Sequence, residues 1–256
     1  MNNRLTPATY VTLAALVVLG SLFAWRFAGQ GENPAAKGLP AQDVEKIVRN
    51  YLLKNPEVIA ESLAALEQKR EAAQAAAAQT ALARHQAQLY SDPEAPVGGN
   101  PQGDVTIVEF FDYRCGFCRK VHPAVESVLQ KDAKVRIIFK EFPILGPPSV
   151  LAARAALASR AQGKYHPFHK ALMSGGGSFS EAEILQTAAS VGLDPDRLKK
   201  DMAAPEIEKV IEKNHALAQA LNIRGTPAFV VGNRLVPGAM EEADLSALVR
   251  ETRAGK

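Results

Sequence analysis

Two cysteines carry the most reactive groups of this chain, and they stand two residues apart as Cys115-Gly-Phe-Cys118. Three kinds of chemistry use a cysteine pair at this spacing. They are a structural metal site, an inert disulfide and a redox centre that alternates between dithiol and disulfide. The residues around the pair and elsewhere in the chain decide between them.

A zinc site is the least supported reading, because a structural zinc ion takes four ligands and this motif supplies two. The sequence has no second cysteine pair, so further ligands would have to come from His122 or from the distant pair His166 and His169. An inert disulfide is also a poor explanation, since so short a loop constrains the unfolded chain little. We therefore favour redox chemistry, with no metal or bound cofactor in the catalytic cycle.

The elements expected around the cysteines fit this interpretation. The apolar stretch VTIVEFF, residues 105–111, predicts a β-strand, and a helix is expected to follow directly from the cysteines. Free N–H groups at a helix start favour thiolate over thiol, so Cys115 is expected to be the nucleophile. Cys118 lies one turn further and is expected to resolve the mixed disulfide. Gly116 and Phe117 are expected to keep the turn compact and to leave Cys115 uncovered.

Two flanking residues support the redox interpretation. Glu109 is charged although its strand is otherwise mostly apolar. It is either solvated at a sheet edge or buried behind the cysteines, where it would pass protons during exchange, and we favour the buried position. Pro123 falls within the expected helix, where the missing N–H should kink it.

The N-terminus contains an uncharged, mostly apolar run, residues 8–25, which follows Arg4. Its length reaches the lower limit for a helix that spans a bilayer. Trp25 and Arg26 close the run where a signal-peptide cleavage site would begin. A membrane anchor within residues 1–28 is therefore favoured over a cleaved signal peptide, and both place the following residues outside the cytoplasm.

Residues 29–41 are expected to form a polar spacer and residues 42–90 a helical extension with a joint at Asn55-Pro56. An apolar stripe of this size needs a partner, so residues 42–88 are expected to form a homo-oligomer, with a trimer suspected. The alternative is a monomer whose extension packs on its own domain or acts as a stalk. The stripe consists of Val44, Ile47, Val48, Tyr51, Leu52, Ile59, Leu63 and Leu66.

Residues 91–256 are expected to form the main domain, which begins with a linker or entry loop over residues 91–104. After the first strand and helix come a second strand, a block of helices over about residues 146–220, a hairpin and a closing helix. This order predicts an α/β sheet with an inserted helical domain. A net charge of +3 without a basic stripe argues against nucleic acid as a partner.

The sequence resembles a known group of proteins in several motifs together. Glu109, the CGFC motif and Pro123 stand at the spacing of the thioredoxin superfamily. VEFFDYRCGFCRKVHP and RGTPAFVVG resemble the DsbA family, in its Com-like and ScsC-like subset of exported thiol–disulfide proteins. The resemblance runs from Val105 to the C-terminus, and VRNYLLKNPEVIAESLAAL resembles the N-terminal association region of ScsC-like proteins.

The resemblance implies a thioredoxin fold with a helical insertion. It also implies that Thr226-Pro227 is a cis peptide facing the cysteines, and that the backbone of Thr226 binds extended substrate as an added strand. DsbA oxidases typically carry Pro-His between their cysteines, whereas this chain has Gly116-Phe117. With Thr226 before the proline, the chain looks more like the isomerase and reductase members.

The expected function is therefore thiol–disulfide exchange on cysteines of exported proteins, with isomerase or reductase favoured and a disulfide-forming oxidase as the alternative. A chaperone or a copper-handling protein with a secondary CxxC motif stays open, because one such motif can hold Cu(I). The expected location is the periplasmic side of the bacterial inner membrane, or the soluble periplasm if the N-terminal segment is cleaved. A membrane or periplasmic redox partner is expected as well.

Overall fold

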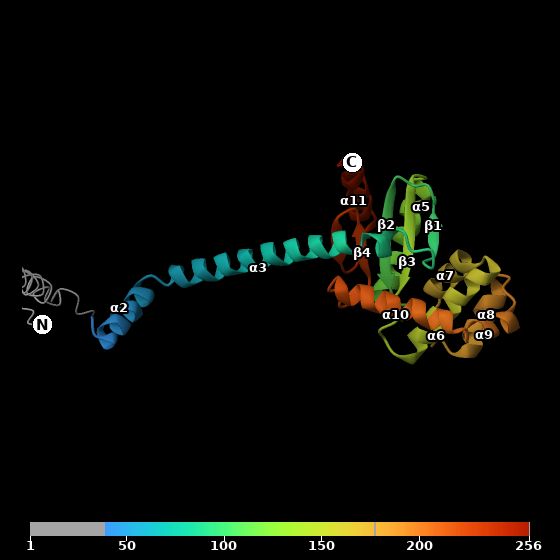
Figure 1. Cartoon of the computed structure of the whole chain (residues 1–256), viewed down its shortest axis with the longest axis horizontal. Helices are drawn as coiled ribbons and strands as arrows, with labels where there is room; N and C mark the ends of the chain where they lie inside the picture. The colour runs from blue at the N-terminus through green and yellow to red at the C-terminus, as the bar shows by residue number, and fades with distance from the viewer. Residues whose placement is uncertain (1–38, 177, 256) are drawn as a thin grey trace, which may run out of the picture. The chain divides into compact units, whose positions relative to one another are not determined.

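The computed structural model describes residues 39–176 and 178–255 (Figure 1). It divides the chain into two compact units, Met1–Glu67 and Gln68–Lys256. The anchor expected within residues 1–28 lies outside the described residues. Among the residues that are described, none of the helices combines the length and the apolar character needed to cross a bilayer.

The described part of the first unit is helical. Helix α2 is Ala41–Lys54, and helix α3, Glu57–Arg84, begins in this unit. The two helices meet at Asn55 and Pro56, so the expected joint is confirmed. None of the residues of α2 is buried, and most of the apolar stripe lies at the surface. Its exposed members are Val44, Ile47, Val48, Tyr51, Ile59, Leu63 and Leu66.

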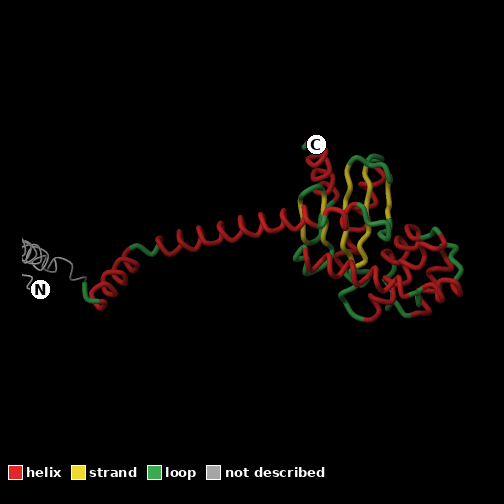
Figure 2. The backbone as a smooth tube through the Cα atoms, in the orientation of Figure 1, coloured by secondary structure: helices red, strands yellow, loops and turns green. Residues whose placement is uncertain are grey.

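The second unit contains a sheet of five strands in the order β1-β3-β2-β4-β5 (Figure 2). Strands β2 and β3 are parallel, and every other neighbouring pair is antiparallel. β2 therefore lies at the centre of the sheet, between β3 and β4. The strands are β1 Val97–Gly99, β2 Val105–Phe111, β3 Val135–Glu141, β4 Ala228–Val231 and β5 Arg234–Pro237.

The helices of this unit follow the expected order. A block of helices separates β3 from β4 in sequence and gathers beside the sheet (Figure 1). It consists of α6 Pro147–Ala158, the short 3₁₀ helix η2 Ser159–Gln162, α7 Tyr165–Ser174, α8 Glu181–Ser190, α9 Pro195–Asp201 and α10 Pro205–Ala220. Outside this block lie α4 Gln86–Tyr90, α5 Gly116–Lys131 and α11 Glu242–Ala254.

Local sequence signals set two of the helix starts. Ser180 and Glu183 form the reciprocal capping box of α8, in which each side chain bonds to the backbone N–H of the other residue. The Asp194 side chain accepts hydrogen bonds from the N–H groups of Asp196 and Arg197 at the start of α9, where Pro195 takes the first position.

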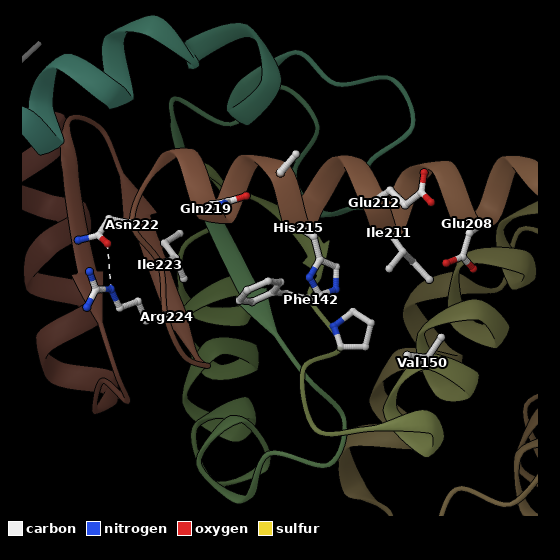
Figure 3. A pocket seen from close by; sticks show the side chains of 12 residues that line it. Phe142, Val150, Glu208, Ile211, Glu212, His215, Gln219, Asn222, Ile223 and Arg224 are labelled. Carbon is white, nitrogen blue, oxygen red and sulfur yellow. Dashed lines mark hydrogen bonds between the residues drawn. The ribbon is translucent and has the colours of Figure 1, made fainter.

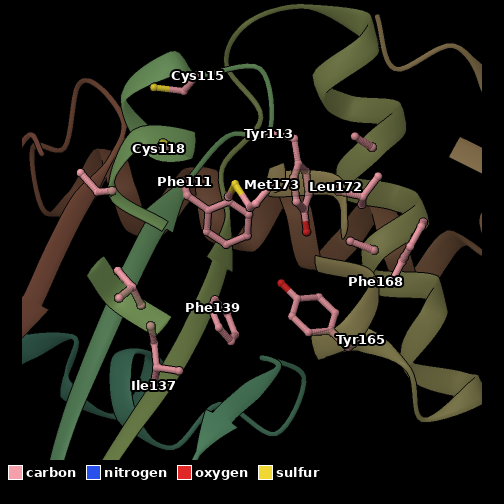
Figure 4. Close-up of a cluster of buried hydrophobic side chains, with 14 of the residues drawn as sticks. Phe111, Tyr113, Cys115, Cys118, Ile137, Phe139, Tyr165, Phe168, Leu172 and Met173 are labelled. Atoms are coloured by element: carbon pink, nitrogen blue, oxygen red, sulfur yellow. The ribbon is translucent and has the colours of Figure 1, made fainter. Parts of the chain in front are cut away.

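The central strand β2 supplies both faces of the core. Ile107 and Phe111 point into a cluster with residues of α5, α7 and α11, part of which is drawn in Figure 4. Val108 and Phe110 belong to a second cluster, on the face covered by α10. Because successive side chains of a strand point to opposite faces, this alternation fixes which β2 residues can lie under the cysteine-bearing helix α5.

The second core cluster also contains Leu82 of α3 and Leu89 of α4, which are 5 % and 0 % exposed. The last turns of the helical extension therefore belong to the core of the second unit. The expected boundary at residues 90 and 91 falls inside this core, whereas the structure divides the chain between Glu67 and Gln68.

The stretch 91–104, expected to be a linker or an entry loop, is built into the domain. Its strand β1 pairs with β3. The carboxylate of Asp92 binds Lys140 Nζ at 2.6 Å, and both side chains are almost fully buried. Asp92 also binds Lys213 Nζ of α10 at 2.8 Å. A buried ion pair of this kind costs several kcal/mol when one partner is removed, so it fastens the stretch to the sheet.

Candidate active site

The two cysteines lie at the start of α5, as expected (Figure 4). Cys115 is the N-cap residue, and its backbone N–H donates to the carbonyl of Asp112 at 3.0 Å. Both thiols are free, and Cys118 is fully buried. Cys115 retains 7 % of its surface, which is less than the sequence led us to expect. Phe117 is 65 % exposed beside it.

The two thiols differ strongly in acidity. The hydrogen bond from the Cys118 thiol is the largest cause that lowers the pKa of Cys115 from 9.0 to about 5, and the Thr226 side chain and the backbone N–H groups of Phe117 and Cys118 add to it. Burial raises the pKa of Cys115, but the hydrogen bonds together lower it by more. The pKa of Cys118 is raised, first by burial and then by its bond to Cys115. At neutral pH the pair therefore holds one thiolate, on Cys115, and one thiol, on Cys118.

The loop before β4 approaches the cysteines from another part of the chain. The peptide bond between Thr226 and Pro227 is cis, as the resemblance implies. The Sγ atom of Cys115 lies 3.2 Å from the Thr226 carbonyl oxygen and donates to it in the thiol form. The structure thus brings Cys115, Cys118 and Thr226 together from segments that are more than a hundred residues apart in sequence.

Glu109 is buried, with 2 % of its surface exposed. A position at a sheet edge is excluded, because β2 is the central strand and Glu109 lies opposite Phe139 of β3 and Phe229 of β4. Burial is the main cause that raises the pKa of Glu109 to about 8, and the negative charge of Glu126 adds to it. The charge of Glu109 in turn raises the pKa of Cys118. A buried acid thus lies within electrostatic range of the buried thiol.

Replacing Glu109 by glutamine is expected to slow disulfide exchange about tenfold or more at neutral pH while the protein stays folded. A buried thiol cannot lose its proton to water directly, and a positioned carboxylate that accepts protons contributes at least this much in other enzymes. Single-turnover kinetics between pH 6 and 9 measure the effect. The rise in rate through pH 8 should be present in the wild type and absent in the variant. The exposed Glu251→Gln variant is the control, and equal rates in all three proteins would remove the proton-transfer role.

Pro123 lies inside α5, on its exposed side. Its ring nitrogen carries no hydrogen, so the carbonyl of Arg119 loses its usual partner in the helix. The expected kink at this position stays a prediction. Gly116 is exposed, and a side chain at its Cβ position would meet no atom within 4 Å. Space alone therefore does not require glycine between the cysteines.

Asp112, which the sequence reading left out, holds the loop in front of the cysteines. Its buried carboxylate accepts hydrogen bonds from the N–H groups of Arg114 at 2.7 Å, Ile144 at 2.8 Å and Leu145 at 3.0 Å. Arg114 Nη1 also donates to the Leu145 carbonyl at 2.6 Å. The loop before Cys115 is thereby tied to the loop after β3. An acid directly after a buried strand is the signal that could have identified it.

A buried polar cluster around Glu141 joins the sheet to the helical insertion. The Glu141 carboxylate lies 3.0 Å from the Tyr113 hydroxyl and 2.8 Å from the Tyr165 hydroxyl, and Tyr113 is 3.0 Å from His169 Nδ1. Figure 4 shows the two tyrosines facing each other across the space between β3 and α7. Burial raises the pKa of Glu141 well above and lowers that of His169 well below the usual values. Both groups are therefore neutral.

The histidines considered as ligands lie away from a metal-binding arrangement. The rings of His122 and His169 contact each other with centroids 5.2 Å apart, and His166 binds the Glu126 carboxylate at 2.9 Å. In residues 39–176 and 178–255, no group of three or more histidine, cysteine, aspartate or glutamate side chains is arranged to hold a metal ion.

Comparison with known proteins gives matches for both units. Residues 106–250 match the family described as DSBA-like thioredoxin domain, and residues 42–73 match the family described as Copper resistance protein ScsC N-terminal domain. A thioredoxin-like oxidoreductase from Silicibacter pomeroyi DSS-3 is 49 % identical, with a TM-score of 0.64. The match covers 66 % of this chain and 97 % of that one.

Two further relatives are similar at lower identity. A linker-deletion mutant of Proteus mirabilis ScsC is 28 % identical with a TM-score of 0.68, and the match covers 88 % of this chain and 100 % of that one. The thiol:disulfide interchange protein DsbA of Bordetella parapertussis is 28 % identical over 58 % of this chain and 73 % of its own. The chain spans about a quarter of the length of the first curated relatives it matches, which are named Na(+)/H(+) antiporter NhaA.

Proposed function

Because the chain belongs to the family of DSBA-like thioredoxin domains, whose members are generally thiol–disulfide oxidoreductases, we propose that it reduces and isomerises disulfides in exported proteins. The observation that carries the proposal is the difference in acidity between the two thiols at the start of α5. A protein that starts from the reduced state needs a free thiolate, and the hydrogen bonds to Cys115 stabilise one at neutral pH.

The proposed cycle begins when the Cys115 thiolate attacks a sulfur of a substrate disulfide. A mixed disulfide forms and one substrate thiolate leaves. In reduction, Cys118 passes its proton to Glu109 and attacks the Cys115 sulfur, which releases the second substrate thiolate and leaves the protein as a disulfide. In isomerisation, the freed substrate thiolate attacks another substrate disulfide and frees a different substrate thiolate. That thiolate attacks the mixed disulfide, forms the new substrate disulfide and releases the Cys115 thiolate, with no net transfer of electrons.

The same acidity supports one alternative within the class. A low thiol pKa stabilises the dithiol relative to the disulfide, so the disulfide form is a strong oxidant. An oxidase that receives disulfides from a redox partner would use this property. Copper handling has support from the match of residues 42–73 to the N-terminal domain of the copper resistance protein ScsC. The chain's own two thiols supply at most two ligands within the described residues.

We further propose that the first unit makes the protein an oligomer, with a trimer suspected, and that it acts in the periplasm. The exposed apolar stripe of α2 and α3 supports the oligomer, because an unpartnered stripe of this size buries itself against another surface. Several active sites held around one misfolded substrate have a high effective concentration, which favours isomerisation. An N-terminal anchor at the periplasmic face of the membrane remains part of the proposal.

Deleting the first unit tests the proposal. A chain from Leu39 to the C-terminus is expected to be an oligomer by light scattering, to reduce disulfides and to isomerise a scrambled protein. A chain from Gln68 keeps Leu82 and Leu89 in its core and is expected to be monomeric, to reduce disulfides at the same rate per site and to isomerise at least about tenfold more slowly.

Point variants show whether the apolar stripe itself, and not the length of the chain, causes the association. Ile47→Asp places a charge in the stripe and should dissociate the oligomer, while the neighbouring Arg49→Asp should leave it intact. A monomer from the chain that begins at Leu39 would contradict the oligomer, and equal isomerisation by both chain lengths would contradict its role.

A further inference from the structure

A groove of about 930 Å³ lies between α10 and the loop that follows β3 (Figure 3). Its floor is apolar, because Phe142, Ile211 and Ile223 contribute side chains from three different segments. His215 projects from α10 over this floor, with its ring 4.8 Å from the Phe142 ring and inclined to it by 62°. The floor offers room for an apolar side chain and an aromatic edge to pack against.

Besides α10, the groove is lined by two loops that also lead to the cysteines. On one side, Arg224 lines the groove two residues before Thr226, whose carbonyl lies 3.2 Å from the Cys115 sulfur. On the other side, the Phe142 N–H donates to the Phe111 carbonyl at 2.9 Å. The loop then continues to Leu145, whose N–H is held by Asp112. Two segments that line the groove on the α10 face of the sheet are therefore continuous with the loops that hold the redox centre.

The two ends of the groove carry opposite charges. Arg224 lies at the end near Thr226, and Glu208 and Glu212 lie one helical turn apart at the other end, as Figure 3 shows. Glu208 pairs with Arg154 at 3.3 Å. Glu212 has no ion pair among the residues that the structure describes, and its side chain is exposed. The distant end of the groove thus offers one uncompensated negative charge.

We propose that this groove binds the segment of a substrate protein next to its reacting cysteine, and that it prefers an apolar side chain followed by a basic one. From Glu212 to the end of α10 at Ala220 the helix rises about 12 Å, which equals about four residues of extended chain. The distance from Ala220 to Cys115 adds to this length, so the basic side chain belongs at least about four residues from the cysteine. This inference rests on the proposed function, because it specifies the substrate of the same redox centre.

The test uses the reduced full-length protein and short peptides whose single cysteine forms a mixed disulfide with glutathione. The peptides come in two pairs that carry lysine or glutamate five residues before or five residues after the cysteine, with leucine between. Release of the peptide thiol gives kcat/KM. We expect the lysine peptide of at least one pair to react about three- to tenfold faster than its glutamate partner, as a partly exposed ion pair allows.

Glu212→Lys is expected to remove or reverse this preference. Glu206→Lys makes the same charge change on an exposed position of α10 that does not line the groove, and it should keep the wild-type preference. Oxidised glutathione is too small to reach Glu212 and should react equally with all three proteins. Equal rates for lysine and glutamate in both pairs, or the same change in both variants, would overturn the subsite. Failure to react with any disulfide would overturn the proposed function and the subsite with it.

Discussion

Cys115→Ser is expected to lower the rate of disulfide exchange by about a thousandfold or more, because the thiolate that attacks the substrate is lost and a serine hydroxyl stays protonated. Cys118→Ser is expected to behave differently. Its Cys115 still attacks, but the mixed disulfide is no longer resolved from within the protein, so it accumulates.

Mass spectrometry under non-reducing conditions distinguishes the two variants. The Cys118→Ser protein should be found joined to a substrate peptide, and the Cys115→Ser protein should not. Cys118→Ala leaves no side-chain donor at this position and so removes the hydrogen bond that is the largest cause of the low Cys115 pKa, and the pKa of Cys115 should rise in the alanine variant. Mixed disulfides on Cys118 instead of Cys115 would reverse the assignment of roles.

In the reduced protein, iodoacetamide is expected to modify Cys115 along a pH profile with a midpoint near 5, and to leave Cys118 unmodified below pH 8. At pH 6 the thiolate fraction of a thiol with a pKa of about 5 exceeds that of an ordinary thiol roughly a thousandfold. The lower nucleophilicity of an acidic thiolate removes most of this advantage. The net expectation is a rate about tenfold above that of a model thiol, measured by peptide mapping of the alkylated protein. A midpoint near 8 or 9 would contradict the hydrogen bonding described for Cys115.

The same shift links the stability of the reduced protein to pH. The pKa of Cys115 is lower in the folded than in the unfolded chain, so its contribution is fully present above about pH 9 and is lost as the pH falls towards 5. Glu109 has the opposite effect on the stability of the folded protein. Its pKa is raised to about 8, so its burial destabilises the folded protein increasingly as the pH rises above 4.5. The difference in urea midpoint between wild type and Cys115→Ala, which share Glu109, should therefore grow between pH 5 and 9.

The sequence allowed much of this architecture to be predicted because the signals were local. A run of β-branched and aromatic residues predicts β2, and the helix that follows the cysteines is expected directly behind it. A single charged residue within that strand predicted the burial of Glu109. Lys140, which is also charged in a mostly apolar strand and fully buried, carries the same signal and was not recognised.

What could not be predicted depends on contacts between distant segments. The Glu141 cluster joins the end of β3 to Tyr113 of the loop after β2 and to Tyr165 and His169 of α7. The two α7 residues lie one turn apart, but nothing in the sequence places them beside Tyr113 and Glu141. Strand β1 is only three residues long and contains two glycines, so it lacks the alternation that identifies a strand. β1 forms because it pairs with the edge of β3. The packing there is close, since a side chain at Gly98 would come within 2.9 Å of Ile137 and Phe139.

The position of β4 next to β2 has a consequence for how the chain folds. Ile107 pairs with Val231, so the centre of the sheet closes only after the whole helical insertion has been synthesised. Contacts between residues so far apart in sequence slow folding, because the entropy of closing the loop is lost before the pairing compensates for it. The helices α6 to α10 shorten the effective loop if they form first, since helices need only local contacts. We expect the insertion to act as the early folding unit, with β4 adding to β2 late.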